Sequence, residues 1–210
     1  MQANEETAAL QAEGARIFTG HDADHISGAG ALIMSAAIPA DNPEVQAAQK
    51  AGLPVLNRAR HLGHLMADDI GIAVAGSHGK TTTTGMIAQI LLAAEMDPTV
   101  IVGGTLPTLG SNGRFGEGDF FVIEADEYDN MFHGLKPEVI VITNIEHDHP
   151  DFFPTEDAYL DAFRQFAHLL PDGGHLIACG EDAGVDKLLD LLTLSDADIT
   201  TYAVGDSLSA

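Results

Sequence analysis

Residues 76–84, with the sequence GSHGKTTTT, carry the most specific chemistry in the chain. They lie between an apolar run at 71–75 and a segment with helical character at 80–95. In this setting turn amides and a helix start bind an anion, a lysine neutralises terminal phosphates, and a hydroxyl binds Mg²⁺. The usual phosphate loop would need glycine at position 74, where Val74 stands, so we interpret the segment as a shortened phosphate loop. The residues predicted to bind the nucleotide are Gly76, Ser77, His78, Gly79, Lys80, Thr81 and Thr82.

Carboxylates follow the apolar run at 120–124, which ends in Glu124. A carboxylate at the end of a strand beside a phosphate loop is where an NTPase holds its metal, directly or through water. A buried strand followed by a solvated acidic loop is the alternative. Coupled to the loop at 76–84, the pattern predicts that a carboxylate of the segment 124–127 holds a metal there.

A third polar cluster, TNIEHDHPD at 143–151, follows the apolar run at 139–143. His149 is predicted to bind a metal, whereas His147 is expected to support the site or to be solvated. A hydrolase metal site of the His-x-His-x-Asp-His kind is an alternative, but Phe152 stands where its last histidine would be.

Strand and helix patterns alternate along the chain and predict an α/β fold, a parallel sheet with helices on both faces. Strands are expected at 31–36, 54–56, 71–75, 99–102, 120–124, 139–143, 175–179 and 200–204. Helices are expected at 5–14, 43–51, 58–66, 80–95, 155–170 and 182–192. Residues 103–118 contain six glycines and one proline and are predicted to be a loop. Ligands bind beyond the carboxyl ends of parallel strands, so the three motifs should share one edge of the sheet.

The composition narrows the classes of partner and the cellular location that fit this chain. There are 32 acidic and 9 basic residues, and the net charge of −23 disfavours binding to nucleic acid or anionic membranes. Adaptation to high salt is a second explanation of this charge. The single cysteine, Cys179, excludes an internal disulfide, and no long apolar run or secretory start is present, so a cytoplasmic location is expected.

The strings AGSHGKTTTT, IEADEYD and TNIEHDHPD occur in the order and spacing of the central ATPase domain of the Mur ligases of peptidoglycan synthesis, which they resemble. SAAIPADNPE at 35–44 and GLPVLNRARHLGHLM at 52–66 resemble the end of that family's N-terminal domain. One departure is Ala36, where the family usually has a second serine. The resemblance implies a P-loop-type central ATPase domain at 68–210, incomplete, after the C-terminal part of a Rossmann-like nucleotide-sugar domain at 1–67. The strand expected at 200–204 is the last element of the chain and would lie at the edge of the sheet, which indicates that the chain is a fragment of a longer protein.

The resemblance also implies ATP-dependent amide formation, in which UDP-N-acetylmuramate is activated as an acyl phosphate and L-alanine displaces phosphate. Lys80 would hold the β- and γ-phosphates. Thr81 and Glu124 would bind one Mg²⁺, and Glu124 and His149 a second. The catalytic residues implied are Lys80, Glu124 and His149, and the substrate contacts are Ser35, Asn42 and Asn144. The helix at 155–170 contains no lysine, which agrees with the alanine-adding branch.

Two alternatives stay open. The first is the branch that attaches a tripeptide to the same nucleotide sugar, although the short segment 130–136 favours alanine. The second is a non-catalytic fragment that keeps a nucleotide site. Amino-acid specificity and oligomeric state are not predicted.

Overall fold

A computed structural model describes residues 5–35, 37–194 and 197–204, so Ala36, the last residue of the strand expected at 31–36, lies outside the described residues. The chain forms two compact units, residues 1–61 and 62–210. The predicted division after residue 67 stays a prediction.

The first unit contains a small parallel pair of strands joined by a helix, as the sequence predicts. β1 (Leu32–Met34) pairs with β2 (Val55–Asn57), and α2 (Pro43–Lys50) lies between them in the chain. The Asn42 side chain caps α2 by accepting from the Glu44 N–H at 2.9 Å. The remaining elements are α1 (Glu5–Ala12), a 3₁₀ helix (Ala23–Ile26) and α3 (Arg58–Leu65), which crosses into the second unit.

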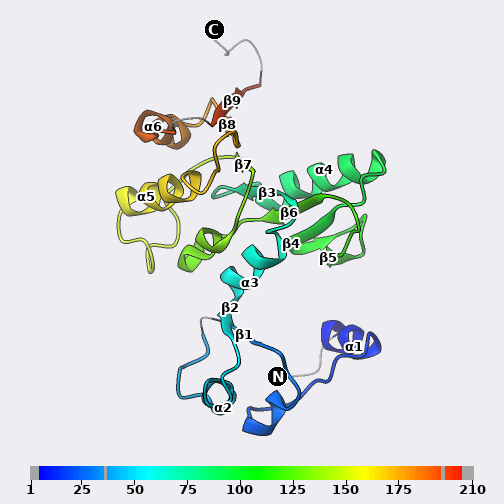
Figure 1. Cartoon of the computed structure of the whole chain (residues 1–210). Coiled ribbons are helices and arrows are strands. Elements are labelled where there is room, and N and C mark those ends of the chain that lie inside the picture. The colour runs from blue at the N-terminus through cyan, green and yellow to red at the C-terminus, as the bar shows by residue number, and fades with distance from the viewer. Residues whose placement is uncertain (1–4, 36, 195–196, 205–210) are drawn as a thin grey trace. The chain divides into compact units, whose positions relative to one another are not determined.

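The second unit is built on a seven-stranded sheet with the order β5-β4-β6-β3-β7-β8-β9 (Figure 1). The strands are β3 (Ile70–Ala75), β4 (Thr99–Leu106), β5 (Ser111–Arg114), β6 (Phe120–Glu124), β7 (Val139–Ile142), β8 (His175–Cys179) and β9 (Asp198–Tyr202). All neighbours run parallel except β4 and β5. β9 lies at the edge of the sheet, as predicted.

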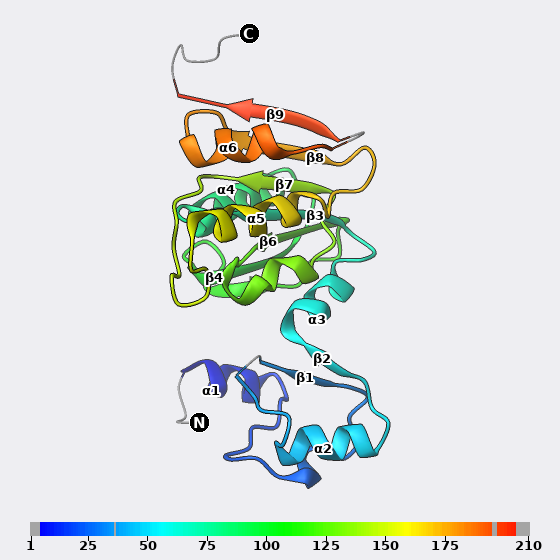
Figure 2. The same cartoon turned by 90° about the vertical axis from the view of Figure 1, so that its left-hand side faces the viewer.

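Helices cover both faces of this sheet (Figures 1 and 2). α4 (Lys80–Ala93) lies on one face, and α5 (Glu156–Ala167) and α6 (Ala183–Leu191) lie on the other. The buried residues of α5 recur at helical spacing and pack into the main core: Tyr159, Ala162, Phe163, Phe166 and Ala167. A 3₁₀ segment, Tyr128–Gly134, joins the same core through Phe132, whose ring stacks on Phe166.

The prediction of a loop over 103–118 was wrong, because this region forms much of a β4–β5 hairpin. Val100 pairs with Arg114 and Leu106 with Ser111, with an irregular register between them. Glycine disfavours strands on average, but here it permits a close approach: a Cβ on Gly103 would lie 3.2 Å from a carboxylate oxygen of Glu124. The Asp97–Arg114 ion pair, at 2.5 Å, closes the open end of the hairpin.

The sheet order confirms that the three polar motifs meet at one edge. β6 and β7 both pair with β3, so the segments that follow these three strands emerge side by side. Among the helices that the structure describes, none has the length and apolar content needed to cross a membrane.

Candidate nucleotide and metal site

The turn between β3 and α4 depends on two glycines. Gly76 has φ 139°, and a Cβ there would lie 2.0 Å from the Thr143 hydroxyl oxygen, so only glycine fits. Gly79 has φ 83° and directly precedes α4, which begins at Lys80. The first amides of a helix have no partners within it, so the turn presents N–H groups and the positive end of the helix dipole. This is a suitable place for a phosphate.

Asn144, which follows β7, fixes this turn from the neighbouring strand. Its Oδ1 accepts from the His78 N–H at 2.9 Å, and its Nδ2 donates to the His78 carbonyl at 2.9 Å. Its own carbonyl accepts from the Ser77 N–H at 3.1 Å. The amides of Ser77 and His78 are therefore used within the protein, and those at the start of α4 are the better anion donors.

Lys80 lies over the turn and is held by two groups. Its ammonium donates to the Gly76 carbonyl at 2.6 Å and to the Glu127 carboxylate at 2.9 and 3.2 Å. The Lys80 side chain keeps 15% of its surface exposed, whereas that of Glu127 keeps 1%. The lysine thus joins a buried carboxylate to the open side of the loop.

Thr81 and Glu124, the two predicted Mg²⁺ ligands, lie together. The Thr81 hydroxyl donates to the two carboxylate oxygens of Glu124 at 3.1 and 2.9 Å, and the Gly103 N–H donates to Oε2 at 2.8 Å. A hydroxyl and one carboxylate fit Mg²⁺, which takes oxygen ligands and completes its shell with water and phosphate. Within the described part of the chain, no three His, Cys, Asp or Glu side chains form a metal-binding group of their own.

His149 lies next to Glu127. Its Nε2 is 3.7 Å from Glu127 Oε1, and its ring makes an edge contact with Tyr128 at a centroid distance of 5.0 Å. His149 has φ 52°, and its N–H donates to Asp148 at 2.7 Å, which lowers the pKa of that carboxyl group. The metal role of His149 stays a prediction.

His147 has a structural contact of its own. Its Nε2 lies 2.8 Å from the Phe153 carbonyl, to which it donates. This hydrogen bond closes the segment between β7 and α5.

Glu127 and Tyr159 are the site residues that the sequence reasoning missed. The Tyr159 hydroxyl donates to Glu127 Oε1 at 3.2 Å and lies 2.9 Å from the Ser77 hydroxyl, and burial raises the pKa of Tyr159. A signal for Glu127 exists in the sequence, where Ile123 and Ala125 alternate with Glu124 and Asp126, so that Glu127 falls on the same side as the apolar pair. In the structure Ile123, Ala125 and Glu127 are all buried, at 2%, 1% and 0% exposure. The inward face of β6 therefore continues beyond the strand and carries a carboxylate.

The predicted substrate contacts lie in different places. Ser35 is exposed, and its hydroxyl accepts from the Ala37 N–H at 3.3 Å. Asn42 is buried as the cap of α2, and Asn144 holds the phosphate loop. Thr82 lies exposed in the first turn of α4. The substrate roles of the first three residues stay predictions.

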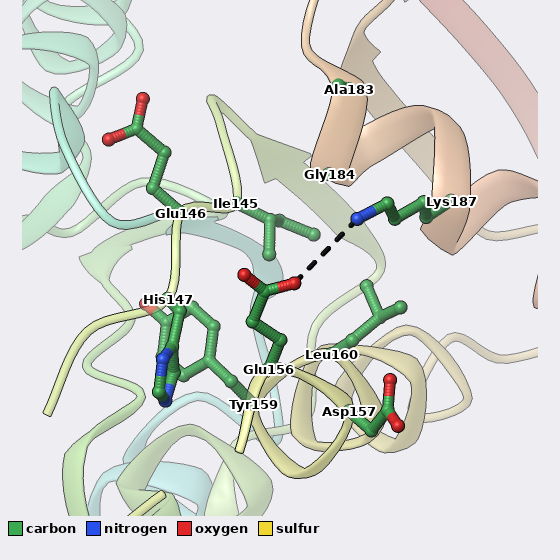
Figure 3. A pocket seen from close by; sticks show the side chains of 10 residues that line it. All are labelled: Ile145, Glu146, His147, Glu156, Asp157, Tyr159, Leu160, Ala183, Gly184 and Lys187. Carbon is green, nitrogen blue, oxygen red and sulfur yellow. Dashed lines mark ion pairs between the residues drawn. The ribbon is translucent and has the colours of Figure 1, made fainter. Parts of the chain in front are cut away.

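A pocket of about 200 Å³ opens beside this centre, between the segment after β7 and the starts of α5 and α6 (Figure 3). Its lining includes Tyr159 and His147, and the Lys187–Glu156 ion pair, at 3.9 Å, spans it. Its charged lining contains more carboxylates than cations, with Glu146, Glu156 and Asp157 against Lys187. Phosphate is therefore better placed at the loop than in this pocket.

Two family models match the chain. The Mur ligase middle domain matches residues 74–209, and the Mur ligase family, catalytic domain matches residues 1–69. A UDP-N-acetylmuramate–L-alanine ligase of Oleidesulfovibrio alaskensis is 47% identical over 196 residues, which are 93% of this chain and 42% of that protein. The chain thus spans less than half the length of this relative.

Solved structures agree with this match. A UDP-N-acetylmuramate:L-alanyl-gamma-D-glutamyl-meso-diaminopimelate ligase from Neisseria meningitides is 26% identical with a TM-score of 0.81, over 95% of this chain and 67% of that one. A UDP-N-acetylmuramate-alanine ligase from Thermotoga maritima is 28% identical with a TM-score of 0.79, over 98% of this chain and 46% of that one.

Proposed function

Because the chain belongs to the Mur ligase family, we propose that it handles ATP in a ligase that joins L-alanine to UDP-N-acetylmuramate in peptidoglycan synthesis. The observation that carries the proposal is the convergence of Lys80, Thr81 and Glu124 at one edge of the sheet. A cation, a hydroxyl and a carboxylate at the start of a helix are the groups that a magnesium nucleotide needs.

The residues of the site have separate tasks in this proposal. The first amides of α4 and the ammonium of Lys80 would hold phosphate oxygens, while Thr81 and Glu124 would hold Mg²⁺, with His149 beside them. ATP would supply the phosphoryl group that activates the substrate carboxylate. The protein needs no nucleophile for this chemistry, because positioning and charge neutralisation lower the barrier.

The acceptor is proposed to be L-alanine. The alanine-adding relative is 47% identical, and its name states that substrate. The solved tripeptide ligase has a TM-score of 0.81 and the solved alanine ligase 0.79, so the fold does not separate the two branches. Addition of the tripeptide is therefore the second candidate. Small-molecule substrates of this class and the net charge of −23 favour action in the cytoplasm, away from nucleic acid.

Titration of the 210-residue chain with Mg·ATP, followed by amide chemical shifts, tests the nucleotide site. We expect saturable shifts at residues 76–84 and their loss in Lys80→Ala. Because this variant leaves the buried Glu127 without its counter-charge, the amide spectrum outside the loop is used to verify that it is folded. Equal titration curves for both proteins would contradict the proposal.

Replacing the matching segment of the Oleidesulfovibrio alaskensis ligase with this chain tests whether L-alanine or the tripeptide is the acceptor. Phosphate release that requires L-alanine supports the first candidate, and release that requires the tripeptide supports the second. The unmodified ligase is the control.

A further inference from the structure

Glu127 is a fully buried carboxylate for which the proposed reaction has no direct use. A buried charge is tolerated only when it is paired and hydrogen-bonded. Glu127 has both kinds of support, the Lys80 ammonium at 2.9 Å and the Tyr159 hydroxyl at 3.2 Å. The nearby His149 ring, at 3.7 Å, adds a third polar neighbour.

The Glu127 carboxylate is held in place by Tyr159, on the side of the protein core. Tyr159 is 1% exposed and packs edge-on against Phe153 and Phe163 within the core. Its hydroxyl also lies 2.9 Å from that of Ser77, which bonds the backbone of Glu146. A rigid chain of contacts therefore runs from the core through Tyr159 and Glu127 to Lys80.

The ammonium group of Lys80 has three N–H donors. One is directed to the Gly76 carbonyl, and the two contacts to the oxygens of the single Glu127 carboxylate can share a second, which leaves the third for a ligand on the open side of the loop. Swinging the lysine away would leave Glu127 buried without its counter-charge, which is strongly unfavourable. Lys80 should therefore bind phosphate from its present position, without leaving Glu127.

We propose that Glu127, backed by Tyr159, is a positioning residue that holds the Lys80 ammonium in place with one donor free for a phosphate oxygen. This inference rests on the proposed nucleotide function. It predicts an effect opposite to simple electrostatics, because removing a negative charge near a phosphate site would by itself tighten anion binding.

The test compares Glu127→Gln with Asp129→Asn in the 210-residue chain, with Mg·ATP as the ligand. Asp129 is exposed and lies two residues along, with φ 54°, a conformation that asparagine tolerates, so the control removes the same charge without touching Lys80. We expect Glu127→Gln to weaken Mg·ATP binding about tenfold, the size of one lost charge-assisted hydrogen bond. Asp129→Asn should leave binding unchanged or slightly tighter.

A second readout follows Lys80 directly. Its ammonium protons should give a ¹⁵N-correlated NMR signal, because hydrogen bonding slows their exchange with water. The signal is assigned by its loss in Lys80→Ala. It should be lost or strongly broadened in Glu127→Gln and should persist in Asp129→Asn. If Glu127 had only a structural role, a Glu127→Gln variant whose amide spectrum is otherwise unchanged would keep the Lys80 ammonium signal.

The outcomes separate the two proposals. Binding of Mg·ATP that is equal in the parent chain and Lys80→Ala would overturn the proposed nucleotide site and this inference with it. Lys80-dependent binding that Glu127→Gln leaves unchanged or tighter would overturn only the positioning role. If Glu127→Gln does not fold, Tyr159→Phe decides, since it keeps the carboxylate and removes one hydroxyl. We then expect about a threefold loss of affinity and a shifted Lys80 signal, and no change in either would overturn the inference.

Discussion

Both ends of the Asn144 side-chain amide bond the backbone of His78, at 2.9 Å each, although 66 residues separate the two in the chain. The end of β7 thereby holds the middle of the phosphate loop. The loop's shape is therefore set by its neighbour strand as well as by its own glycines.

Replacing Asn144 with alanine should loosen this loop. We expect the free energy of unfolding to fall by about 1–2 kcal/mol, because two hydrogen bonds are lost and the loop can be rehydrated. Hydrogen exchange at the His78 amide should accelerate more than exchange in β3. Asn144→Asp keeps the acceptor for the His78 N–H but places a carboxylate oxygen against the His78 carbonyl, so it should accelerate this exchange as well. Unchanged exchange at His78 in both variants would contradict this role.

Glu124→Gln and His149→Ala should each raise the Mg²⁺ concentration needed for half-maximal ATP binding. The first removes the charge of a predicted metal ligand, and the second removes a predicted ligand entirely. His147→Ala is the matched control, because its Nε2 is used by the Phe153 carbonyl. It should lower thermal stability and leave the Mg²⁺ dependence nearly unchanged. A Mg²⁺ titration in which His147 matters more than His149 would reverse the assignment.

The sequence predicted the parallel sheet and the three motifs at its edge, because apolar strands followed by polar clusters leave a clear local pattern. It failed at residues 103–118, where glycine composition indicated a loop and long-range pairing built a hairpin. Glu127 was missed for a related reason. Its burial depends on Lys80 and Tyr159, which are distant in the chain, and carboxylates are usually exposed.

The hairpin should respond to acid through Asp97. The Glu117 N–H, at 2.8 Å, and the Arg114 guanidinium lower the pKa of Asp97 below its ordinary value of 3.8. A carboxyl group whose pKa is lowered on folding stabilises the fold above its unfolded pKa, and this contribution is lost as the pH falls through the folded value. The protection factors of the amides in β4 and β5, which are corrected for the intrinsic pH dependence of exchange, should therefore fall as the pH drops below about 4. Asp97→Asn should show low protection factors already at pH 6 and little further change, and a variant whose protection has the same pH dependence as the parent would contradict this.

The net charge of −23 should make the fold sensitive to salt. Repulsion between exposed carboxylates is screened over a Debye length of about 10 Å at 0.1 M salt. We expect the melting temperature to rise from low to molar KCl, because few cations are present to lose ion pairs on screening. A melting temperature that stays flat or falls would remove the high-salt explanation of the acidic surface.

The last prediction concerns the strength of nucleotide binding by the 210 residues themselves. The groups proposed to hold ligand in this site, Lys80, Thr81 and Glu124, would contact only phosphate and metal, and they lie together at one edge of the sheet. The 47% identical ligase is more than twice as long as the matched segment, since that segment covers 42% of it. If the base and ribose are bound by the remainder of such proteins, about 4 kcal/mol of binding free energy is missing here, the difference between micromolar and millimolar affinity. We therefore expect a millimolar dissociation constant for Mg·ATP.

Incubation with ATP, Mg²⁺, UDP-N-acetylmuramate and L-alanine should give no ligation, because an activated carboxylate on an open edge is exposed to water. Calorimetry and a phosphate-release assay on the same preparation measure both quantities. Phosphate release that requires all three substrates would contradict the prediction and would mean that these residues contain a complete active site.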